Sequence, residues 1–291
     1  MDSIKIVVKK EFDQMNVKEL LKCFNVGKGK IEEIRNNFSI KINKEKASLE
    51  SVVSTKDEVT FFFTEKIDYT PYSLKLDVVY EDEYLLIVNK PSGMLIHPDK
   101  EDNDKTLVNV VASYYYENKI FRNVRYVHRI DEETSGIVIF AKDFITMGLL
   151  NDMIINKTLK RYYLALCHNK FKNLKGEINA SIGRDRHQSN KYRVSSSSMS
   201  KSAKTTYEVV KEYKGYSLVK LLLDTGRTHQ IRVHMSYFNH PLLGDSLYGG
   251  KKDLIKRVAL HSYQVKFNHP ITNEYLDVVC PLHEDMKRLE K

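Results

Sequence analysis

An unbroken apolar run in the middle of the chain places the strongest limit on its fold. The six residues from Gly136 to Ala141 read GIVIFA and include no charged side chain. A run that is apolar on both faces and rich in β-branched residues is typical of a strand at the buried centre of a sheet. The sequence therefore predicts a central strand here, covered on both faces.

A charged segment leads directly into this strand. Residues 126–136 read YVHRIDEETSG, so Asp131 lies on the loop before the strand, beside Arg129 and His128. A loop anchored on a rigid core can hold a reactive side chain in a fixed position. Asp131 is therefore interpreted as a functional carboxylate, and the alternative is an exposed acidic turn. The basic neighbours and the tight Thr-Ser-Gly turn favour the functional interpretation.

A second basic cluster follows the strand-like run Ser217–Leu223. Residues 225–234 read TGRTHQIRVH, and the apolar residues from here on have helical spacing, at i, i+4 and i+7 (Ile231, Met235 and Phe238). This spacing predicts a helix near 227–238, capped by Thr225 or Thr228. Arg232 lies beside the apolar stripe, so we expect it to point into a partly buried cleft.

The histidines of this cluster do not form a zinc motif. His229 and His234 are five positions apart, and no HExxH sequence occurs. Two histidines on one helix bind zinc when they are four positions apart. We therefore interpret them as hydrogen-bonding or structural residues.

The composition favours a polyanionic partner and a reducing compartment. The chain has 291 residues and a formal net charge of +9, which suits either a polyanion or a well-solvated surface. Its three cysteines are widely spaced and form no CxxC pair, which argues against a disulfide framework or a cysteine zinc site. The first residues lack the pattern of a signal peptide, and no apolar run approaches the roughly 18 residues of a membrane helix. We expect a cytoplasmic protein without membrane contact.

Residues 1–65 have the pattern of a small separate domain. Amphipathic helices are predicted at 17–24 and 30–35, and strands at 38–43 and 59–63. This lysine-rich arrangement resembles the alpha-L RNA-binding domain, although Asn36-Asn37 and Asn43-Lys44 stand where that domain usually has hairpin glycines. Asparagine tolerates the positive φ of such turns. We expect this domain to contribute RNA affinity or target choice, and residues 66–75 to form a linker.

The remaining residues, 76–291, predict one α+β domain. Apolar strands alternate irregularly with helical stretches near 104–117, 143–157 and 227–238, which favours a largely antiparallel, mixed sheet. Between Arg184 and Lys204 there are six Arg or Lys residues against one Asp, together with the run SSSSMS. This segment is predicted to be a mobile loop, either a solvated tether or a loop that becomes ordered against phosphates.

Several long blocks resemble the RluA-type RNA pseudouridine synthases. They are VYEDEYLLIVNKPSGMLIHP (79–98), HRIDEETSG (128–136), KRYYLALC (160–167), TGRTHQIRVH (225–234) and HPLLGDSLYG (240–249). The blocks occur in the order typical of that family and span roughly residues 76–291. The resemblance implies the pseudouridine synthase fold and its reaction. In that reaction the uracil of a uridine in RNA is detached from ribose at N1, turned, and rejoined through C5.

The resemblance also implies catalytic roles for three residues. Asp131 corresponds to the catalytic aspartate, which must be ionised whether it adds to ribose C1′ or abstracts a ribose proton. Arg232 corresponds to the guanidinium that favours this ionised form. Tyr163 corresponds to a tyrosine that stacks on the base and assists proton removal from C5. By its own pattern, Tyr163 reads equally as a core tyrosine of a strand.

Five further residues are expected to contact the substrate. Arg129 and Arg227 would hold phosphates or brace the loop, Ile231 would pack beneath the base, and the same motifs contain His128 and Lys90. The target uridine must be flipped out of its stack, which costs least in irregular RNA. We expect no metal, no cofactor and a monomeric protein.

Three functions remain open at this point. An RNA pseudouridine synthase is the first, with large-subunit ribosomal RNA expected before transfer RNA as its substrate. An RNA glycosylase or nuclease could also use Asp131, and would release uracil or cleave the strand. A catalytically silent RNA-binding or ribosome-assembly factor would account for the charge, but not for Asp131, Tyr163 and Arg232 at the family's positions.

Overall fold

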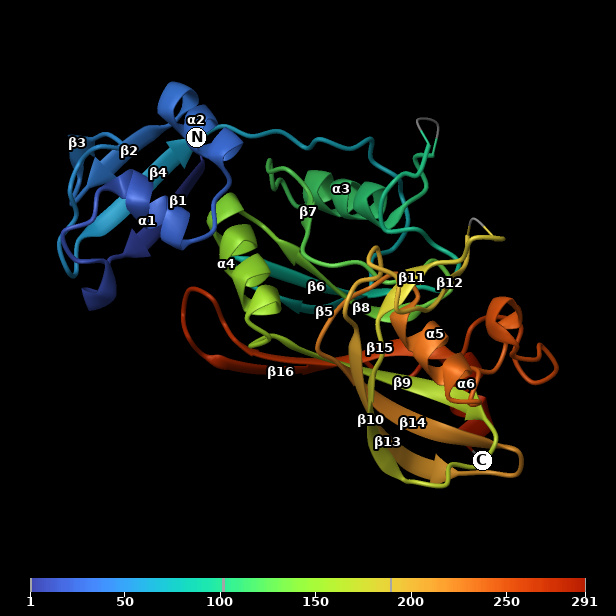
Figure 1. The fold of residues 1–291 in the computed structure, drawn as a ribbon. Helices are drawn as coiled ribbons and strands as arrows, with labels where there is room; N and C mark the ends of the chain where they lie inside the picture. The colour runs from blue at the N-terminus through green and yellow to red at the C-terminus, as the bar shows by residue number, and fades with distance from the viewer. Residues whose placement is uncertain (1, 101–102, 189, 291) are drawn as a thin grey trace.

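The computed structural model describes residues 2–100, 103–188 and 190–290. Figure 1 shows a small N-terminal part lying beside a larger part built on one long sheet. No helix in the described ranges is both long and apolar enough to cross a bilayer.

The N-terminal part is a four-stranded antiparallel sheet packed against two helices. Its strands have the order β1-β4-β2-β3. The elements are β1 (Asp2–Val7), the short 3-10 turn η1 (Lys10–Phe12), α1 (Val17–Cys23), α2 (Lys28–Asn37), β2 (Ser39–Ile42), β3 (Glu45–Ala47) and β4 (Glu58–Phe63). A reciprocal capping box between Asn16 and Glu19 begins α1.

One expectation about asparagine turns in this part is right and the other is wrong. Asn43 and Lys44 have φ of 51° and 79° and form the turn between β2 and β3. Asn36 and Asn37 instead form the last residues of α2. Helix α2 is longer than its apolar spacing indicated, because the polar residues at its C-terminal end continue the helix on the exposed face.

The larger part is a ten-stranded mixed sheet, which confirms the predicted α+β class and the largely antiparallel arrangement. The strands have the order β10-β13-β14-β9-β15-β8-β6-β5, while β16 pairs with β15 and β7 with β8. Among the strand pairs formed by the described residues, β15 with β8 is the one parallel pair. The strands are β5 (Val78–Glu81), β6 (Leu85–Lys90), β7 (Arg125–Tyr126), β8 (Ser135–Ala141), β9 (Lys160–His168), β10 (Lys175–Asn179), β13 (Lys204–Glu212), β14 (Tyr216–Leu223), β15 (Leu260–Asn268) and β16 (Tyr275–Val279).

The predicted central strand is β8, and every one of its residues is buried. It lies between β15 and β6, at the middle of the sheet. Gly136 at its start has φ 107°, and a Cβ there would lie 2.3 Å from the backbone oxygen of Ser262 on β15. Only glycine allows both this conformation and this approach, so the strand can pair tightly immediately after the Asp131 loop.

Three helices of the larger part agree in place with the predicted helical stretches. They are α3 (Leu107–Glu117), α4 (Phe144–Ile155) and α5 (Gln230–Tyr237). The short helix α6 (Glu284–Lys287) and the 3-10 turns η2 (Ser246–Tyr248) and η3 (Arg288–Glu290) were not predicted. Asp143 caps the N-terminus of α4, and its carboxylate accepts hydrogen bonds from the backbone amides of Ile145 and Thr146.

Helix α4 joins the two parts of the molecule. Phe144 and Ile145 belong to the apolar core of the N-terminal part, where the Phe144 ring packs against Phe38, Phe61 and Phe63. A Cβ on Gly148 would lie 2.1 Å from the backbone oxygen of Phe24 at the end of α1. The backbones of α4 and α1 therefore meet directly, at a place where no side chain fits.

The segment 184–204 is not the single mobile loop that its composition predicted. A hairpin of two antiparallel strands, β11 (Ile182–Arg184) and β12 (Tyr192–Val194), begins just before this segment and ends within it. The phenol oxygen of Tyr248 accepts a hydrogen bond from the backbone of Tyr192. Tyr192 and Val194 pack on a small cluster that includes Val233 of α5. These contacts hold the hairpin strands in place, and residue 189 between them lies outside the described residues.

Candidate active site

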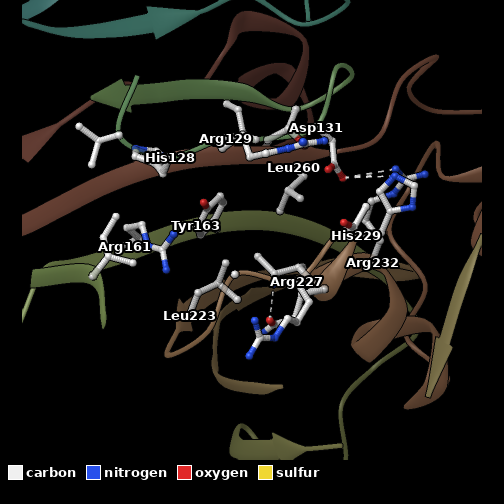
Figure 2. A pocket seen from close by; sticks show the side chains of 18 of the residues that line it. His128, Arg129, Asp131, Arg161, Tyr163, Leu223, Arg227, His229, Arg232 and Leu260 are labelled. Carbon is white, nitrogen blue, oxygen red and sulfur yellow. Dashed lines mark hydrogen bonds and ion pairs between the residues drawn. The ribbon is translucent and has the colours of Figure 1, made fainter. Parts of the chain in front are cut away.

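A cavity of about 570 Å³ lies between the loop before β8, strand β9 and the start of α5 (Figure 2). Of the expected functional residues, seven border this cavity, and only one does not. The seven are Asp131, Tyr163, Arg232, Arg129, Arg227, Ile231 and His128. The sequence motifs, widely separated along the chain, thus converge on one place.

The Asp131 loop is fixed by hydrogen bonds to the loop that follows β6. The backbone oxygen of Glu132 accepts from the amide of Gly93 and from the Lys90 ammonium, both at 2.9 Å. The next carbonyl, of Glu133, accepts from the Ser92 hydroxyl at 2.7 Å. Asp131 itself accepts a backbone hydrogen bond from Thr134 at 3.1 Å, which closes the turn. The Asp131 side chain remains 26% exposed and faces the cavity.

Lys90 is the residue that does not reach the cavity, so its expected RNA contact is wrong for this structure. Its side chain is fully buried, and Nζ also donates to the carbonyls of Pro91 and Met94. Burial lowers the pKa of Lys90 to about 7, against the opposite effect of Asp131 and Glu132. Three carbonyl acceptors require three N–H donors, a geometry that suits the charged ammonium. Lys90 ties the two loops together beneath Asp131.

Arg232 is held mainly by Asp245 rather than by Asp131. Its Nε and Nη2 donate to the two oxygens of Asp245 at 2.8 and 2.9 Å, whereas its Nη1 lies 3.4 Å from Oδ2 of Asp131. Burial works against the charged guanidinium, but Asp245 and then Asp131 raise the pKa of Arg232 overall. A two-point contact with a buried carboxylate fixes the plane of the guanidinium, so that one edge is presented to Asp131.

Tyr163 and Ile231 form apolar walls of the cavity. Tyr163 lies on β9, between β14 and β15, and is only 4% exposed. Burial raises the pKa of Tyr163, so its phenol is protonated at neutral pH. Ile231, at 3% exposure, lies in the first turn of α5. Both residues belong to the same apolar core, which holds them rigidly.

The three basic residues expected at the substrate differ in their surroundings. Arg129 is exposed at the cavity, and Arg227 donates from Nε to the carbonyl of Ser202 at 3.0 Å. His128 is buried, and its Nε2 accepts from the amide of Ile139. Burial, and then the charge of Arg161, lower the pKa of His128 to about 3. His128 therefore lines the cavity as a neutral, buried residue, and its expected contact with the substrate stays a prediction.

The cap of α5 also differs from the expectation. The helix begins after His229, which has φ 56°, and neither Thr225 nor Thr228 caps it. His229 Nδ1 lies 2.9 Å from the Tyr248 hydroxyl, and its Nε2 lies 4.0 Å from Oδ2 of Asp131. Burial is the main cause that lowers the pKa of His229. A neutral imidazole therefore stands beside the Asp131 carboxylate.

Three site residues were not identified from the sequence. Asp245 and Tyr248 both lie in the block HPLLGDSLYG, and the Tyr248 ring lies 5.1 Å from the Arg232 guanidinium carbon. Arg161 borders the cavity two residues before Tyr163. Each lies inside a block that the family resemblance had singled out, which was the available signal. Their roles depend on pairing across the fold, which a linear pattern does not show.

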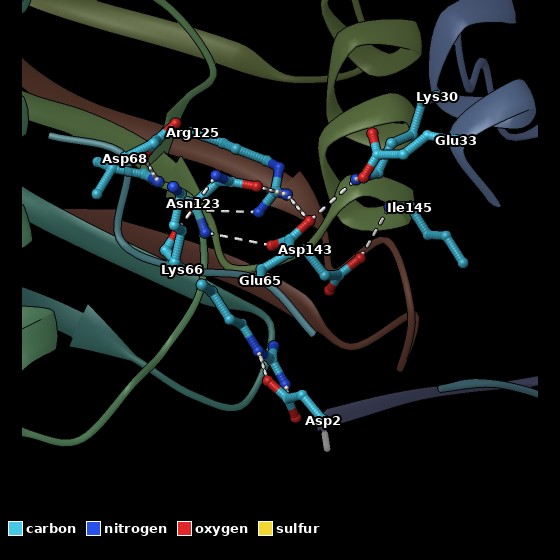
Figure 3. Close-up of polar contacts among 12 residues, drawn as sticks. Asp2, Lys30, Glu33, Glu65, Lys66, Asp68, Asn123, Arg125, Asp143 and Ile145 are labelled. Carbon is cyan, nitrogen blue, oxygen red and sulfur yellow. Dashed lines mark hydrogen bonds and ion pairs between the residues drawn. The ribbon is translucent and has the colours of Figure 1, made fainter. Parts of the chain in front are cut away.

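The N-terminal part also reaches the cavity. Asn25, directly after α1, and Asn151 and Ile155 of α4 are among the lining residues. Figure 3 shows the polar contacts that close the seam between the two parts. The buried Glu65 carboxylate accepts from Lys30 at 3.0 Å, pairs with Arg125, and accepts from the amide of Asn123 at 3.2 Å. The small part is thus fastened next to the cavity.

The expected linker is part of this fastening. Asp68 accepts a hydrogen bond from the amide of Val124 at 2.8 Å, and Tyr72 donates from its amide to the carbonyl of Asn109 at 2.9 Å. Ile67 and Tyr69 pack against the core of the larger part. The segment 66–75 therefore runs along the larger part without regular secondary structure, instead of spanning a gap.

Comparison with known proteins agrees with this geometry. The family described as RNA pseudouridylate synthase matches residues 84–237, and the N-terminal domain of the RluD ribosomal pseudouridine synthase matches residues 4–59. The chain belongs to the RluA-type RNA pseudouridine synthases. As a member of this family it is an isomerase that converts uridine in RNA to pseudouridine. In the described ranges, no group of three or more His, Cys, Asp or Glu side chains is arranged to hold a metal ion.

Individual pseudouridine synthases match over most of their length. The chain is 38% identical to the RNA pseudouridine synthase YhcT of Bacillus subtilis, over 98% of this chain and 96% of that protein. It is 33% identical to the ribosomal large subunit pseudouridine synthase D of Xylella fastidiosa, over 77% and 71% of the two chains. Among solved structures, human RNA pseudouridylate synthase domain containing 1 has a TM-score of 0.60 and 28% identity, over 73% and 86% of the two chains.

Proposed function

We propose that the cavity beside Asp131 is the site of isomerisation, and that Asp131, Tyr163 and Arg232 carry the chemistry. The observation that supports this most directly is the placement of Asp131. Its carboxylate faces a cavity large enough for a nucleotide, on a doubly anchored loop, 3.4 Å from a guanidinium that is itself fixed by Asp245. An ionised carboxylate in a fixed position is what either version of the reaction requires.

The lining residues suggest a role for each group. Asp131 either adds to C1′ of the ribose or removes a proton from the sugar, and in both cases the N1–C1′ bond breaks with its electron pair on N1. Tyr163 and Ile231 offer apolar faces between which the detached base can turn without meeting water. The bond from C5 to C1′ then forms as Asp131 is released from C1′ or returns its proton to the sugar. C5 loses its proton and N1 gains one, so that the product is an isomer of the substrate.

We further propose that the substrate is large-subunit ribosomal RNA, and that residues 1–65 bind it. One relative is named for the large ribosomal subunit, and the N-terminal match is to a domain of a ribosomal pseudouridine synthase. The net charge of +9 favours contact with many phosphates. All groups of the proposed site come from one chain, so we expect a monomer to be sufficient. The three free cysteines are compatible with action in the cytoplasm.

Pseudouridine mapping with a matched pair of variants tests the proposal. Unmodified large-subunit ribosomal RNA and transfer RNA, transcribed in vitro, are incubated with wild-type protein, with Asp131→Asn and with Glu132→Gln. Asp131→Asn keeps the shape of the side chain and removes its charge, so we expect no pseudouridine and unchanged RNA binding. Glu132→Gln alters the next, exposed carboxylate, and is expected to behave as wild type.

The products separate this proposal from the alternatives. Modification of transfer RNA alone would overturn the assignment of the substrate. Free uracil or shortened RNA would indicate a glycosylase or nuclease at Asp131. Near wild-type turnover by Asp131→Asn would show that the reaction occurs elsewhere in the chain.

A further inference from the structure

Arg161 is a buried cation for which the described residues supply no ion-pair partner. The residue is only 6% exposed, and its Nε is shut off from water with no hydrogen-bond acceptor. Across residues 2–100, 103–188 and 190–290, no side chain forms an ion pair with it and no carbonyl accepts from it. Burying an unpaired charge is costly. A buried group left in this state calls for an explanation. The terminal nitrogens of Arg161 lie beside Gly226, which also lines the cavity, so a ligand there is within their reach.

Among the described residues, no carboxylate lies within ion-pair distance of the Arg161 guanidinium. Its backbone pairs with Leu223 and Val265, so the side chain begins from the middle of the large sheet. The titratable neighbours that respond to its charge are His128 and Tyr163. Burial lowers the pKa of His128 and raises the pKa of Tyr163, so neither carries negative charge at neutral pH. The guanidinium faces the same cavity as Asp131.

The cavity thus has a carboxylate and a free guanidinium in different places on its wall. In the view of Figure 2, Tyr163 lies between Asp131 and Arg161. A uridine whose ribose is at Asp131 and whose base lies against Tyr163 directs the far edge of the base, with its carbonyl oxygens, toward Arg161. We propose that Arg161 is a catalytic residue that donates hydrogen bonds to these carbonyls and stabilises the detached uracil as an anion. This inference rests on the proposed role of the cavity as the isomerisation site.

The reaction provides the charge that Arg161 lacks. When the N1–C1′ bond breaks, the electron pair stays on the base, and the negative charge spreads from N1 to the two carbonyl oxygens. The sugar is left electron-deficient, and Asp131 either bonds to C1′ or takes the sugar proton. The base then turns and C5 bonds to C1′, as the bond from Asp131 to C1′ breaks or the proton held by Asp131 returns to the sugar. C5 finally loses its proton and N1 gains one, so the product is a neutral isomer of the substrate. A fixed cation that meets charge only as it develops lowers the barrier more than it strengthens substrate binding.

The first test compares Arg161→Met and Arg161→Lys with wild type, using Arg288→Met as an exposed, unpaired control. The probe is unmodified large-subunit ribosomal RNA transcribed in vitro, and single-turnover rates are measured with enzyme in excess. We expect the rate to fall about 100-fold or more in Arg161→Met. Arg161→Lys should recover part of it, and RNA affinity should stay within about twofold. The urea midpoint of the free protein should be unchanged or higher, because a desolvated charge has been removed.

A second test examines the leaving group itself. In transcripts made with 5-fluorouridine, fluorine withdraws electrons from the ring and stabilises the uracil anion without help from the protein. We expect the defect of Arg161→Met, measured as disappearance of N1-linked nucleoside after nuclease digestion, to shrink several-fold on this RNA. An equal defect on both RNAs would exclude a role at the base anion.

The remaining outcomes are also decisive. A rate within threefold of wild type, or a lost rate together with a lower urea midpoint, would overturn the inference in favour of a dispensable or structural arginine. If Asp131→Asn is inactive while Arg161→Met is active, only this inference fails. If Asp131→Asn is itself active, the cavity is not the reaction site, and it is the proposed function that fails.

Discussion

Arg232 stands between two carboxylates, and the structure predicts very different energies for the two contacts. With Asp245 it makes two charge-assisted hydrogen bonds of 2.8 and 2.9 Å, and the two side chains are 7% and 0% exposed. With Asp131 it makes one long contact of 3.4 Å, and the Asp131 side chain is 26% exposed. Breaking a buried pair costs about 3–5 kcal/mol, whereas a solvated pair contributes about 0–1 kcal/mol.

Two double-mutant cycles measure this difference. One combines Arg232→Met with Asp245→Asn, and the other combines Arg232→Met with Asp131→Asn. The free energy of unfolding of each variant is obtained from urea denaturation, and the coupling is the departure from additivity. We expect a coupling of about 3 kcal/mol for Arg232 with Asp245, and below about 1 kcal/mol for Arg232 with Asp131.

The substitutions at Asp131 and Asp245 should affect the rate of turnover in a different order from the order in which they affect stability. Asp245→Asn should retain a measurable rate, because Arg232 can still reach Asp131, whereas Asp131→Asn should have none although its fold is nearly as stable as wild type. A coupling of Arg232 with Asp131 that equals or exceeds its coupling with Asp245 would refute the reasoning. In that case Arg232 would be held by the catalytic carboxylate itself.

Three further expectations concern other residues. Tyr163→Phe keeps the ring and removes the hydroxyl, so pseudouridine should form slowly while N1–C1′ cleavage persists. Both steps are measured by chromatography of the digested RNA. An equal loss of the two steps would contradict a role of Tyr163 at C5. His128 is neutral when folded, with its pKa near 3, but binds a proton at about pH 6.5 when unfolded. Stability should therefore fall by up to about 1.4 kcal/mol per pH unit as the pH drops from 6.5 toward 3. His128→Gln should flatten this slope in urea titrations, and an unchanged slope would assign it to other groups. Gly148→Val places side-chain atoms against the Phe24 carbonyl, so it should detach the N-terminal part and increase proteolysis near residues 64–77. The exposed control Gly215→Asn should not change the rate of proteolysis. Equal resistance of both variants to the protease would mean that the contact between α4 and α1 adapts to the larger side chain.

The sequence predicted the elements that depend on local pattern. The apolar run of β8 and the helical spacing in α5 were sufficient to place those elements, because burial on two faces or on one stripe leaves a direct periodic signal. The segment 184–204 was misjudged for the corresponding reason. Its hairpin is held by a few contacts of Tyr192 and Val194 with residues far away in the sequence. The composition of the segment itself does not indicate these contacts.

The sequence predicted which residues lie at the site, but not which of them form ion pairs and hydrogen bonds with one another. The motifs named Asp131, Tyr163 and Arg232, and all three border one cavity. The buried roles of Lys90 and His128 could not be foreseen, since a lysine or histidine in a loop motif reads the same whether it faces solvent or neighbouring carbonyls. The dominance of Asp245 over Asp131 likewise depends on a few tenths of an ångström between residues far apart in the chain.

The sharing of α4 has a consequence for synthesis on the ribosome. The N-terminal part leaves the exit tunnel first, yet Phe144 and Ile145 complete its core and are made some eighty residues after its last strand. Until they arrive, the rings of Phe38, Phe61 and Phe63 lack the aromatic neighbour that packs on them in the finished protein. The nascent chain therefore holds an open apolar face while the first strands of the large sheet are being translated. That face would be a natural place for a chaperone to bind, and its closure by α4 couples the completion of the first domain to the growth of the second.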